Sequence, residues 1–298
     1  MKIDSHIHIT PRWLIEDWET MAAKEPYFSL LSHSKSNRFA CAEDVIAALD
    51  GAGVDRAVVF GFAFREMAHC QAVNDYTMEA VQRYPDRLIG LAVVPPTHPD
   101  MADELARCES GGLRGVGELF AEGQGFSLTD EVDTRALMGI CREQGWPLLL
   151  HGNEAVGHPY PGKTSDTPER LAHFVENYPD NTIILAHWGG GLCFYALMPE
   201  MRNVLKNVYF DTAATPYLYD PAIYDTAKTL GLLDRILFGS DFPLLTPLRT
   251  EEHLRQSGLC EEELGLLLGG NAQRIFGYEA QGAALHPPKG YNPFGNPF

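Results

Sequence analysis

The chain has 298 residues, of which 45% are hydrophobic and 21% charged, a composition typical of a globular protein with a sizeable core. Its formal net charge of -17 at pH 7 opposes binding to nucleic acid, because such binding requires Lys and Arg to neutralise phosphate groups. No apolar stretch reaches the roughly 18 residues that a membrane-spanning helix needs, and the N-terminus lacks a basic and then apolar leader. We therefore expect one large cytoplasmic domain without a nucleic-acid or membrane partner.

The first residues alternate in the manner of a β-strand. With a period of two, Asp4, His6 and His8 share one face of this strand. Two imidazoles on one strand face make half of a first-row metal site, since the strand fixes their separation before any ion arrives. Strands also carry histidines by chance, so the pair alone does not establish a metal site.

Residues 10–41 follow this strand and are too aromatic for a simple connector, with Trp13, Trp18, Tyr27 and Phe28 among them. Long inserts at the catalytic end of a fold often form lids or pocket walls. The alternative is a helical hairpin that covers the flank of the domain. The sequence leaves both interpretations open.

Apolar runs and helical patterns alternate along the rest of the chain. The strand-like runs are 2–9, 56–62, 88–95, 113–120, 147–152, 182–188, 207–212 and 236–241. The helical patterns are 42–52, 71–84, 100–110, 131–144, 167–178, 192–206, 220–231, 250–257 and 261–276. Eight such units predict an α/β fold of the closed (β/α)8 or TIM barrel type over residues 1–280, whereas a doubly wound open sheet usually has five or six strands.

The last residues, 281–298, form a tail rich in Pro and Gly, which excludes regular helix or strand. Its Tyr291, Phe294 and Phe298 could dock on a neighbouring subunit of a homo-oligomer. A frayed terminus is the alternative.

Polar residues stand at the carboxyl ends of several predicted strands, where the active sites of such barrels are built. His151, His187 and Asp241 each follow directly after an apolar run. The candidate site residues, which we expect to meet at one rim of the barrel, are His6, His8, Glu118, His151, His187 and Asp241.

With these motifs in order along the chain, the sequence resembles the metal-dependent amidohydrolase superfamily, specifically the amidohydrolase-related branch that also contains aminocarboxymuconate-semialdehyde decarboxylase. The motifs that carry the resemblance are Asp4-Ser5-His6-Ile7-His8, Leu150-His151-Gly152, Ala186-His187-Trp188-Gly189-Gly190 and Phe238-Gly239-Ser240-Asp241-Phe242-Pro243. The first and last of these motifs are the most specific.

The resemblance implies that His6, His8, His151 and Asp241 bind one divalent ion that keeps an open position for water or substrate. His187 then stands beside the ion and exchanges protons, and Asp241 is both ligand and base. Zinc is the metal expected first, and manganese, iron, cobalt and nickel suit the same ligands.

Glu118 leaves the number of ions open. Members of the superfamily with two metals place a carboxylated lysine or a glutamate on the fourth strand as a bridge. If Glu118 is such a bridge, His151 and His187 bind the second ion. The alternative is a carboxylate hydrogen-bonded to Arg114 or Arg65.

Three functions follow from these residues. The leading interpretation is a hydrolase that uses metal-activated water on an ester, lactone or amide bond of a small organic substrate. The alternative is a non-oxidative decarboxylase of a small unsaturated or aromatic carboxylic acid, in which His187 or Asp241 supplies the proton and one of Arg12, Arg38 and Arg65 faces the carboxylate. A non-catalytic metal scaffold is the third, and it would require a closed coordination site.

Overall fold

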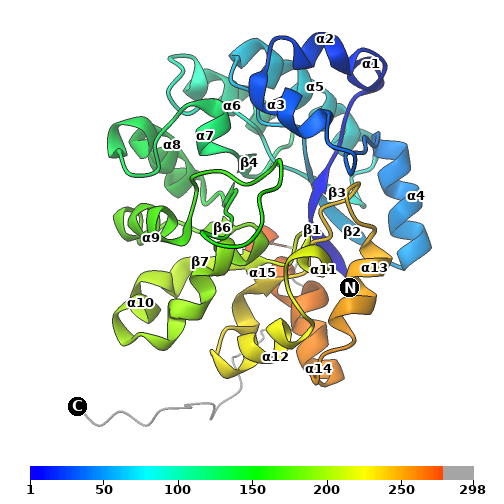
Figure 1. The fold of residues 1–298 in the computed structure, drawn as a ribbon. Coiled ribbons are helices and arrows are strands. Elements are labelled where there is room, and N and C mark those ends of the chain that lie inside the picture. The colour runs from blue at the N-terminus through cyan, green and yellow to red at the C-terminus, as the bar shows by residue number, and fades with distance from the viewer. Residues whose placement is uncertain (278–298) are drawn as a thin grey trace.

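Eight parallel strands form the centre of the molecule, as the alternation of apolar runs predicts. The structure, a computed structural model, describes residues 1–277 of the chain. Figure 1 shows the strands at the centre with the helices arranged around them. The strands are β1 (Ile3–His8), β2 (Arg56–Phe60), β3 (Leu88–Gly90), β4 (Val116–Leu119), β5 (Leu148–Leu150), β6 (Ile183–Leu185), β7 (Val208–Asp211) and β8 (Ile236–Leu237). Each lies within a predicted run and is shorter than that run.

Strands that are consecutive in the sequence are neighbours in the barrel. β1 to β3 pair in order, and β4 to β8 pair in order, always in parallel. Isolated bridges join the two sets at both seams, since Ala92 pairs with Val116 and Ile7 pairs with Phe242. At the second seam the His8 amide donates to the Phe242 carbonyl oxygen at 2.9 Å. The chain therefore forms a closed (β/α)8 barrel, which confirms the predicted fold.

Helices cover the outside of the barrel at the places where helical periodicity predicts them. They are α4 (Ala42–Ala52), α5 (Met67–Arg83), α6 (Met101–Ser110), α8 (Glu131–Gln144), α9 (Pro168–Asn177), α10 (Pro199–Val204), α12 (Ala222–Thr229), α13 (Pro247–Leu254), α14 (Glu261–Gly265) and α15 (Asn271–Phe276). Short helices in the connections are α1 (Arg12–Glu16), α2 (Trp18–Ala22), α3 (Pro26–Ser32), α7 (Ala121–Gln124) and α11 (Thr215–Leu218), with helical turns η1 (His187–Leu197), η2 (Leu205–Asn207), η3 (Leu233–Arg235) and η4 (Leu266–Gly270). Within residues 1–277, none of the helices is both long enough and apolar enough to cross a membrane.

The predicted helix over 192–206 is wrong in its first half. The chain there forms the irregular turns of η1, and a regular helix begins only at Pro199. From Trp188 to Gly191 the φ angles lie between 59° and 96°. These left-handed conformations cannot begin a right-handed α-helix, and Pro199 supplies the new helix N-terminus because its φ angle suits the first helical position.

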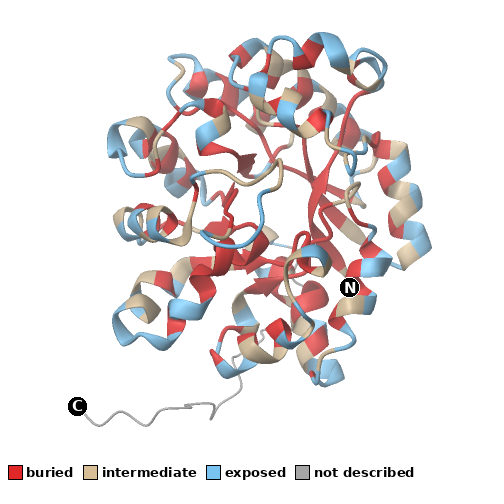
Figure 2. Cartoon of the chain, viewed as in Figure 1, coloured by how far each residue is buried: buried red, intermediate tan, exposed pale blue. Residues whose placement is uncertain are grey.

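The strands are buried on both faces, with only Arg56 and Tyr209 half-buried among their residues. Figure 2 shows this buried centre and the exposed outward faces of the surrounding helices. A polar side chain on such a strand has no solvent to face. The polar residues of the strands must therefore find partners inside the barrel or at its rim.

The insert over residues 10–41 forms α1, α2 and α3 and is anchored to the barrel. Buried Glu25 accepts hydrogen bonds from the amides of Arg65 and Glu66 at 3.0 and 3.1 Å, and its carboxylate lies 2.6 Å from His69 Nδ1. Phe28 is also buried. A lid role for this insert stays a prediction, and the predicted tail at 281–298 lies outside the described residues.

Candidate metal centre

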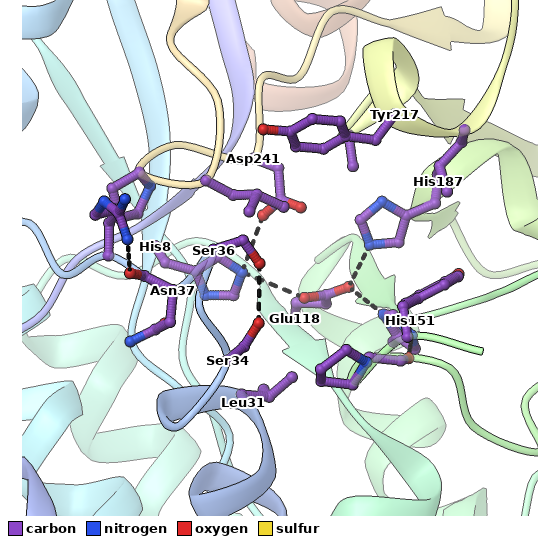
Figure 3. Close-up of a pocket in the computed structure, with 18 of the residues that line it drawn as sticks. His8, Leu31, Ser34, Ser36, Asn37, Glu118, His151, His187, Tyr217 and Asp241 are labelled. Atoms are coloured by element: carbon purple, nitrogen blue, oxygen red, sulfur yellow. Dashed lines mark hydrogen bonds and ion pairs between the residues drawn. The ribbon is translucent and has the colours of Figure 1, made fainter. Parts of the chain in front are cut away.

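All six predicted site residues meet at the carboxyl ends of the strands. His6 and His8 come from β1 and Glu118 from β4, while the others follow β5, β6 and β8. Their exposed fractions lie between 0% and 8%. Figure 3 shows His8, His151, His187 and Asp241 around the Glu118 carboxylate. These side chains meet because the carboxyl ends of parallel strands lie at one rim of the barrel.

Glu118 is surrounded by imidazoles. Its Oε2 lies 3.5 Å from both His6 Nε2 and His8 Nε2, and its Oε1 lies 3.0 Å from His151 Nδ1 and 3.6 Å from His187 Nε2. Asp241 Oδ1 completes the group at 3.7 Å from His6 Nε2 and 3.6 Å from His8 Nε2.

Sequence reasoning offered Arg114 or Arg65 as an alternative partner of Glu118, and the guanidinium groups of both lie against other parts of the chain, that of Arg65 beside Gly125. The Arg114 guanidinium donates to the carbonyl oxygens of Glu109 and Leu113. The structure therefore pairs Glu118 with histidines.

Two overlapping sets of possible ligands share His6. One set is His6, His8 and Asp241, and the other is His6, Glu118 and His187, with the ligand atoms of each set within 4.8 Å of one another. His151 belongs to neither set among the described residues. Its Nδ1 faces Glu118, and its Nε2 lies 2.9 Å from the Gly162 carbonyl oxygen, which ties it to the loop after β5.

The carboxylates of the cluster favour the positively charged form of the neighbouring histidines. Burial by itself lowers the pKa of His6, but the carboxylates of Asp211 and Glu118 raise it well above 6.5 overall. Burial likewise lowers the pKa of His187, whereas its interaction with Glu118 and the charge of Asp241 bring it to about 9. The pKa of Glu118 falls well below 4.5 because His6 and the other imidazoles outweigh the effect of burial.

These residues fit a divalent ion. His6 Nε2 is fully buried, has no hydrogen-bond partner within residues 1–277, and faces the carboxylates of Glu118 and Asp241. A buried nitrogen without a partner is costly unless something binds it. Imidazole nitrogens and carboxylate oxygens are the ligands that first-row transition metals accept in open catalytic sites.

Sequence reasoning missed one buried residue of the site, Asp211 at the end of β7. Its Oδ2 lies 2.8 Å from His6 Nδ1, and its Oδ1 accepts from the amides of His187 at 2.9 Å and Ala213 at 3.0 Å. Asp211 ends an apolar run, so the pattern that marked His151, His187 and Asp241 could have found it.

The backbone around the site adopts conformations that side chains other than glycine rarely take. The φ angles of His187, Trp188, Ala214 and Asp241 are 55°, 61°, 57° and 66°. Such strain persists only where surrounding contacts hold it, and it is frequent at active sites. A Cβ at Gly190 would clash with the Asn153 carbonyl oxygen, so the loops after β5 and β6 approach each other closely only because glycine stands there.

A cavity of about 490 Å³ opens onto the cluster. Two aromatic rings form walls beside the histidines, since Phe62 stacks on His8 at 5.1 Å and Phe120 stacks on His151 at 4.3 Å between ring centroids. The insert contributes Leu31, Ser34, Ser36, Asn37 and Arg38, and the loop after β5 contributes His158, Tyr160, Pro161 and Gly162. Figure 3 shows Leu31, Ser34, Ser36 and Asn37 of the insert on the side of the cavity that faces the histidines and carboxylates.

Known proteins share this architecture. The chain is 24% identical over 247 residues to gamma-resorcylate decarboxylase of Rhizobium sp. (strain MTP-10005), a match that covers 68% of this chain and 74% of that protein. The solved structure of 5-carboxyvanillate decarboxylase from Novosphingobium aromaticivorans, which contains manganese, has a TM-score of 0.74 at 18% identity and covers 93% of this chain and 96% of that one. The structure of a probable 2-pyrone-4,6-dicarboxylic acid hydrolase from Acinetobacter baumannii has a TM-score of 0.64 at 19% identity, over 93% and 99% of the two chains.

These likenesses to solved structures show the same fold. The family model described as amidohydrolase matches residues 3–278, almost the whole chain. The chain therefore belongs to the amidohydrolase superfamily of enzymes, whose members bind divalent metals and act on small-molecule substrates.

Proposed function

We propose that the protein is a metal-dependent decarboxylase of a small aromatic or unsaturated carboxylic acid. The observation that carries this proposal is the cavity, which has aromatic walls and ends on a buried cluster of histidines and carboxylates. An aromatic acid matches such a cavity, because its ring packs against Phe62 and Phe120 while its carboxylate reaches the cluster. The curated relatives support the same reading, since all three that match are named gamma-resorcylate decarboxylase.

Hydrolysis, the leading interpretation of the sequence, is less well supported than decarboxylation. Named decarboxylases are more frequent than hydrolases among the relatives and structural neighbours. We retain hydrolysis as the second candidate because the fold is also similar to that of the 2-pyrone-4,6-dicarboxylic acid hydrolase.

The ion would be held by His6, His8 and Asp241, with Glu118 and His187 beside it. When bound, a divalent ion supplies Lewis-acid stabilisation of negative charge on the substrate oxygens. We expect one ion, whose identity we propose to be zinc or manganese.

His187 is suited to handle the proton that replaces carbon dioxide. Its Nδ1–H donates to the Ala213 carbonyl oxygen at 2.9 Å, so that only Nε2 faces the cavity. In the reaction the bond between the ring carbon and the carboxylate breaks, its electron pair stays on that carbon, and carbon dioxide leaves. The carbon then takes a proton from His187 Nε2, which is replenished from solvent with the help of Asp241.

Arg38 is the arginine that we assign to the substrate. It is the one Lys or Arg side chain that lines the cavity in the described part of the chain. Arg12 instead donates to Cys41 Sγ at 3.4 Å, and Arg65 packs beside Gly125. An arginine at the cavity wall favours an anionic substrate.

The reaction class is tested by what the solvent contributes to the product. The metal-loaded enzyme is given a panel of hydroxybenzoic acids that includes gamma-resorcylate, and a matched panel of lactones and esters, in D2O and in ¹⁸O-labelled water. We expect carbon dioxide release with one deuterium on the ring carbon, and no turnover with His187→Asn. Turnover confined to lactones or esters with ¹⁸O in the product would contradict the proposal and support the hydrolase.

A further inference from the structure

Asp211 contacts both halves of the site with the two oxygens of one carboxylate. Its side chain is fully buried. Oδ2 lies 2.8 Å from His6 Nδ1, whereas Oδ1 accepts from the amides of His187 and Ala213. These three hydrogen bonds are all of ordinary length and buried, so each constrains the group that it binds.

The first contact decides which nitrogen of His6 is available to an ion. An ionised carboxylate can only accept hydrogen bonds, and therefore the neutral His6 ring, which is the form that binds an ion, must carry its one proton on Nδ1. The lone pair of Nε2 is then directed at the space between Glu118 and Asp241, where residues 1–277 offer Nε2 no hydrogen-bond partner. A carboxylate behind a ligand histidine fixes its tautomer and ring orientation in this way.

The second contact fixes His187. Its amide and that of Ala213 converge on Asp211 Oδ1, and its Nδ1–H donates to the Ala213 carbonyl oxygen at 2.9 Å. The φ angles of 55° at His187 and 57° at Ala214 are unfavourable without such bonds. This arrangement directs His187 Nε2 toward Glu118 Oε1, 3.6 Å away.

We propose that Asp211 is the positioning residue that fixes the Nδ1–H tautomer of His6 through one oxygen and the backbone and ring orientation of His187 through the other. It thereby sets the affinity of the site for its metal and the direction of the proton donor. The part that concerns proton donation rests on the proposed function, and the part that concerns metal affinity does not.

The two roles can be separated by substitution. In Asp211→Asn the two amide donors of His187 and Ala213 keep the side-chain oxygen on their side, which leaves the NH2 group against His6 Nδ1. His6 must then accept at Nδ1 and carry its proton on Nε2, where an ion would bind. We expect the dissociation constant for Zn²⁺ to rise ~10- to 100-fold, while His187 keeps its orientation. Asp211→Ala removes both contacts, so that His187 is also released.

The measurements use the full chain, and those of metal affinity and tautomer need no substrate. Competition with a chromophoric chelator gives the dissociation constant for Zn²⁺ alone, and long-range ¹H–¹⁵N spectra of the zinc-loaded protein identify the tautomer of each histidine. Excess Zn²⁺ should restore kcat in Asp211→Asn but not in Asp211→Ala. The matched control is Thr77→Val, which removes the buried hydrogen bond from Thr77 Oγ1 to the Val73 carbonyl oxygen in α5, away from the site. It should change thermal stability without changing tautomers or affinity.

Several outcomes would overturn the proposal. One is a His6 ring in the wild-type zinc-loaded protein that carries its proton on Nε2, a result that requires no variant to fold. Another is an Asp211→Asn variant with the Zn²⁺ affinity of the wild type, or one whose affinity falls no more than that of Thr77→Val. If no carboxylic acid is decarboxylated but the tautomer and affinity results hold, the proposed function fails and the role of Asp211 toward His6 stands.

Discussion

The site brings together carboxylates and imidazoles whose burial without partners would cost free energy. Buried Glu118 lies within 3.6 Å of four imidazoles, and Asp241 lies within 3.7 Å of two of them. A buried carboxylate is tolerated only with such partners. Because the same carboxylates can serve a bound ion or a protonated histidine, the roles of individual residues must be separated by substitution.

Asp241 and His187 can be distinguished by comparing metal content with turnover. Asp241→Asn keeps the size of the side chain and one ligand oxygen but removes the basic carboxylate, so we expect partial metal retention and a fall in turnover of ~10² or more. His187→Asn should reduce turnover more than metal content if the site holds one ion. Elemental analysis and steady-state kinetics on both variants check this.

Two results would contradict this assignment. A metal-replete Asp241→Asn variant with near-normal turnover would show that Asp241 handles no essential proton. Loss of about one equivalent of metal in His187→Asn, from a wild type with two, would show that His187 is a ligand of a second ion and would favour Glu118 as a bridge.

At the scale of elements, the insert is anchored at its middle and reaches the cavity at its end. Glu25 binds the start of α5, while Leu31, Ser34, Ser36, Asn37 and Arg38 line the cavity opposite the histidines and carboxylates. The sequence alone cannot show which arginine lies at the cavity. Arg12, Arg38 and Arg65 are equally plausible for that position until the path of the chain is known. The same limit applies to His151, whose partner Gly162 comes from a loop without periodicity.

Arg38 should govern substrate binding. Its guanidinium donates to the carbonyl oxygens of Lys35 and Asn37, which holds it at the cavity wall. Arg38→Met removes a charged partner worth about 1.5 to 3 kcal/mol in a hydrogen bond to an anion, so we expect kcat/KM for an acidic substrate to fall roughly tenfold or more. This fall in kcat/KM should come mainly from a rise in KM.

Lys35 offers the matched control, since it is an exposed cation in the same loop that does not line the cavity. Lys35→Met should leave KM unchanged. Equal effects of Lys35→Met and Arg38→Met would mean that only the general charge of the loop matters, and an unchanged KM in Arg38→Met would remove the assignment.

At the scale of the whole molecule, the sequence predicts the barrel well because the first strand alternates with a period of two, the later strands lie within buried, largely apolar runs, and strand and helix follow each other in every unit. It also predicts which polar residues meet, because the carboxyl ends of parallel strands share one rim. It does not predict strand lengths, the left-handed turn at Trp188, or the inward role of Asp211, all of which depend on contacts between separate units.

The ligand set of His6, His8 and Asp241 spans the seam where the first and last strands close the barrel. The backbone amide of Ser5 on β1 donates to the Phe238 carbonyl oxygen at 2.7 Å across this seam, and the Asp4 carboxylate accepts from the Ser240 amide at 3.0 Å. His6 and His8 lie on β1, and Asp241 follows β8. An ion bound by all three would therefore connect the two ends of the barrel.

Metal should for this reason stabilise the fold measurably. An ion that binds only the native state adds about 2.7 kcal/mol at a free concentration 100 times its Kd, which for a chain of this size corresponds to a rise in Tm of roughly 4 °C. We expect Zn²⁺ or Mn²⁺ to produce this rise in chelator-treated protein, measured by scanning calorimetry together with elemental analysis. The double variant with His6→Ala and His8→Ala should show neither bound metal nor the rise, because it retains only one of the three ligands that join β1 to β8. An equal rise in that variant would place the stabilising ion elsewhere and would refute the seam as its site.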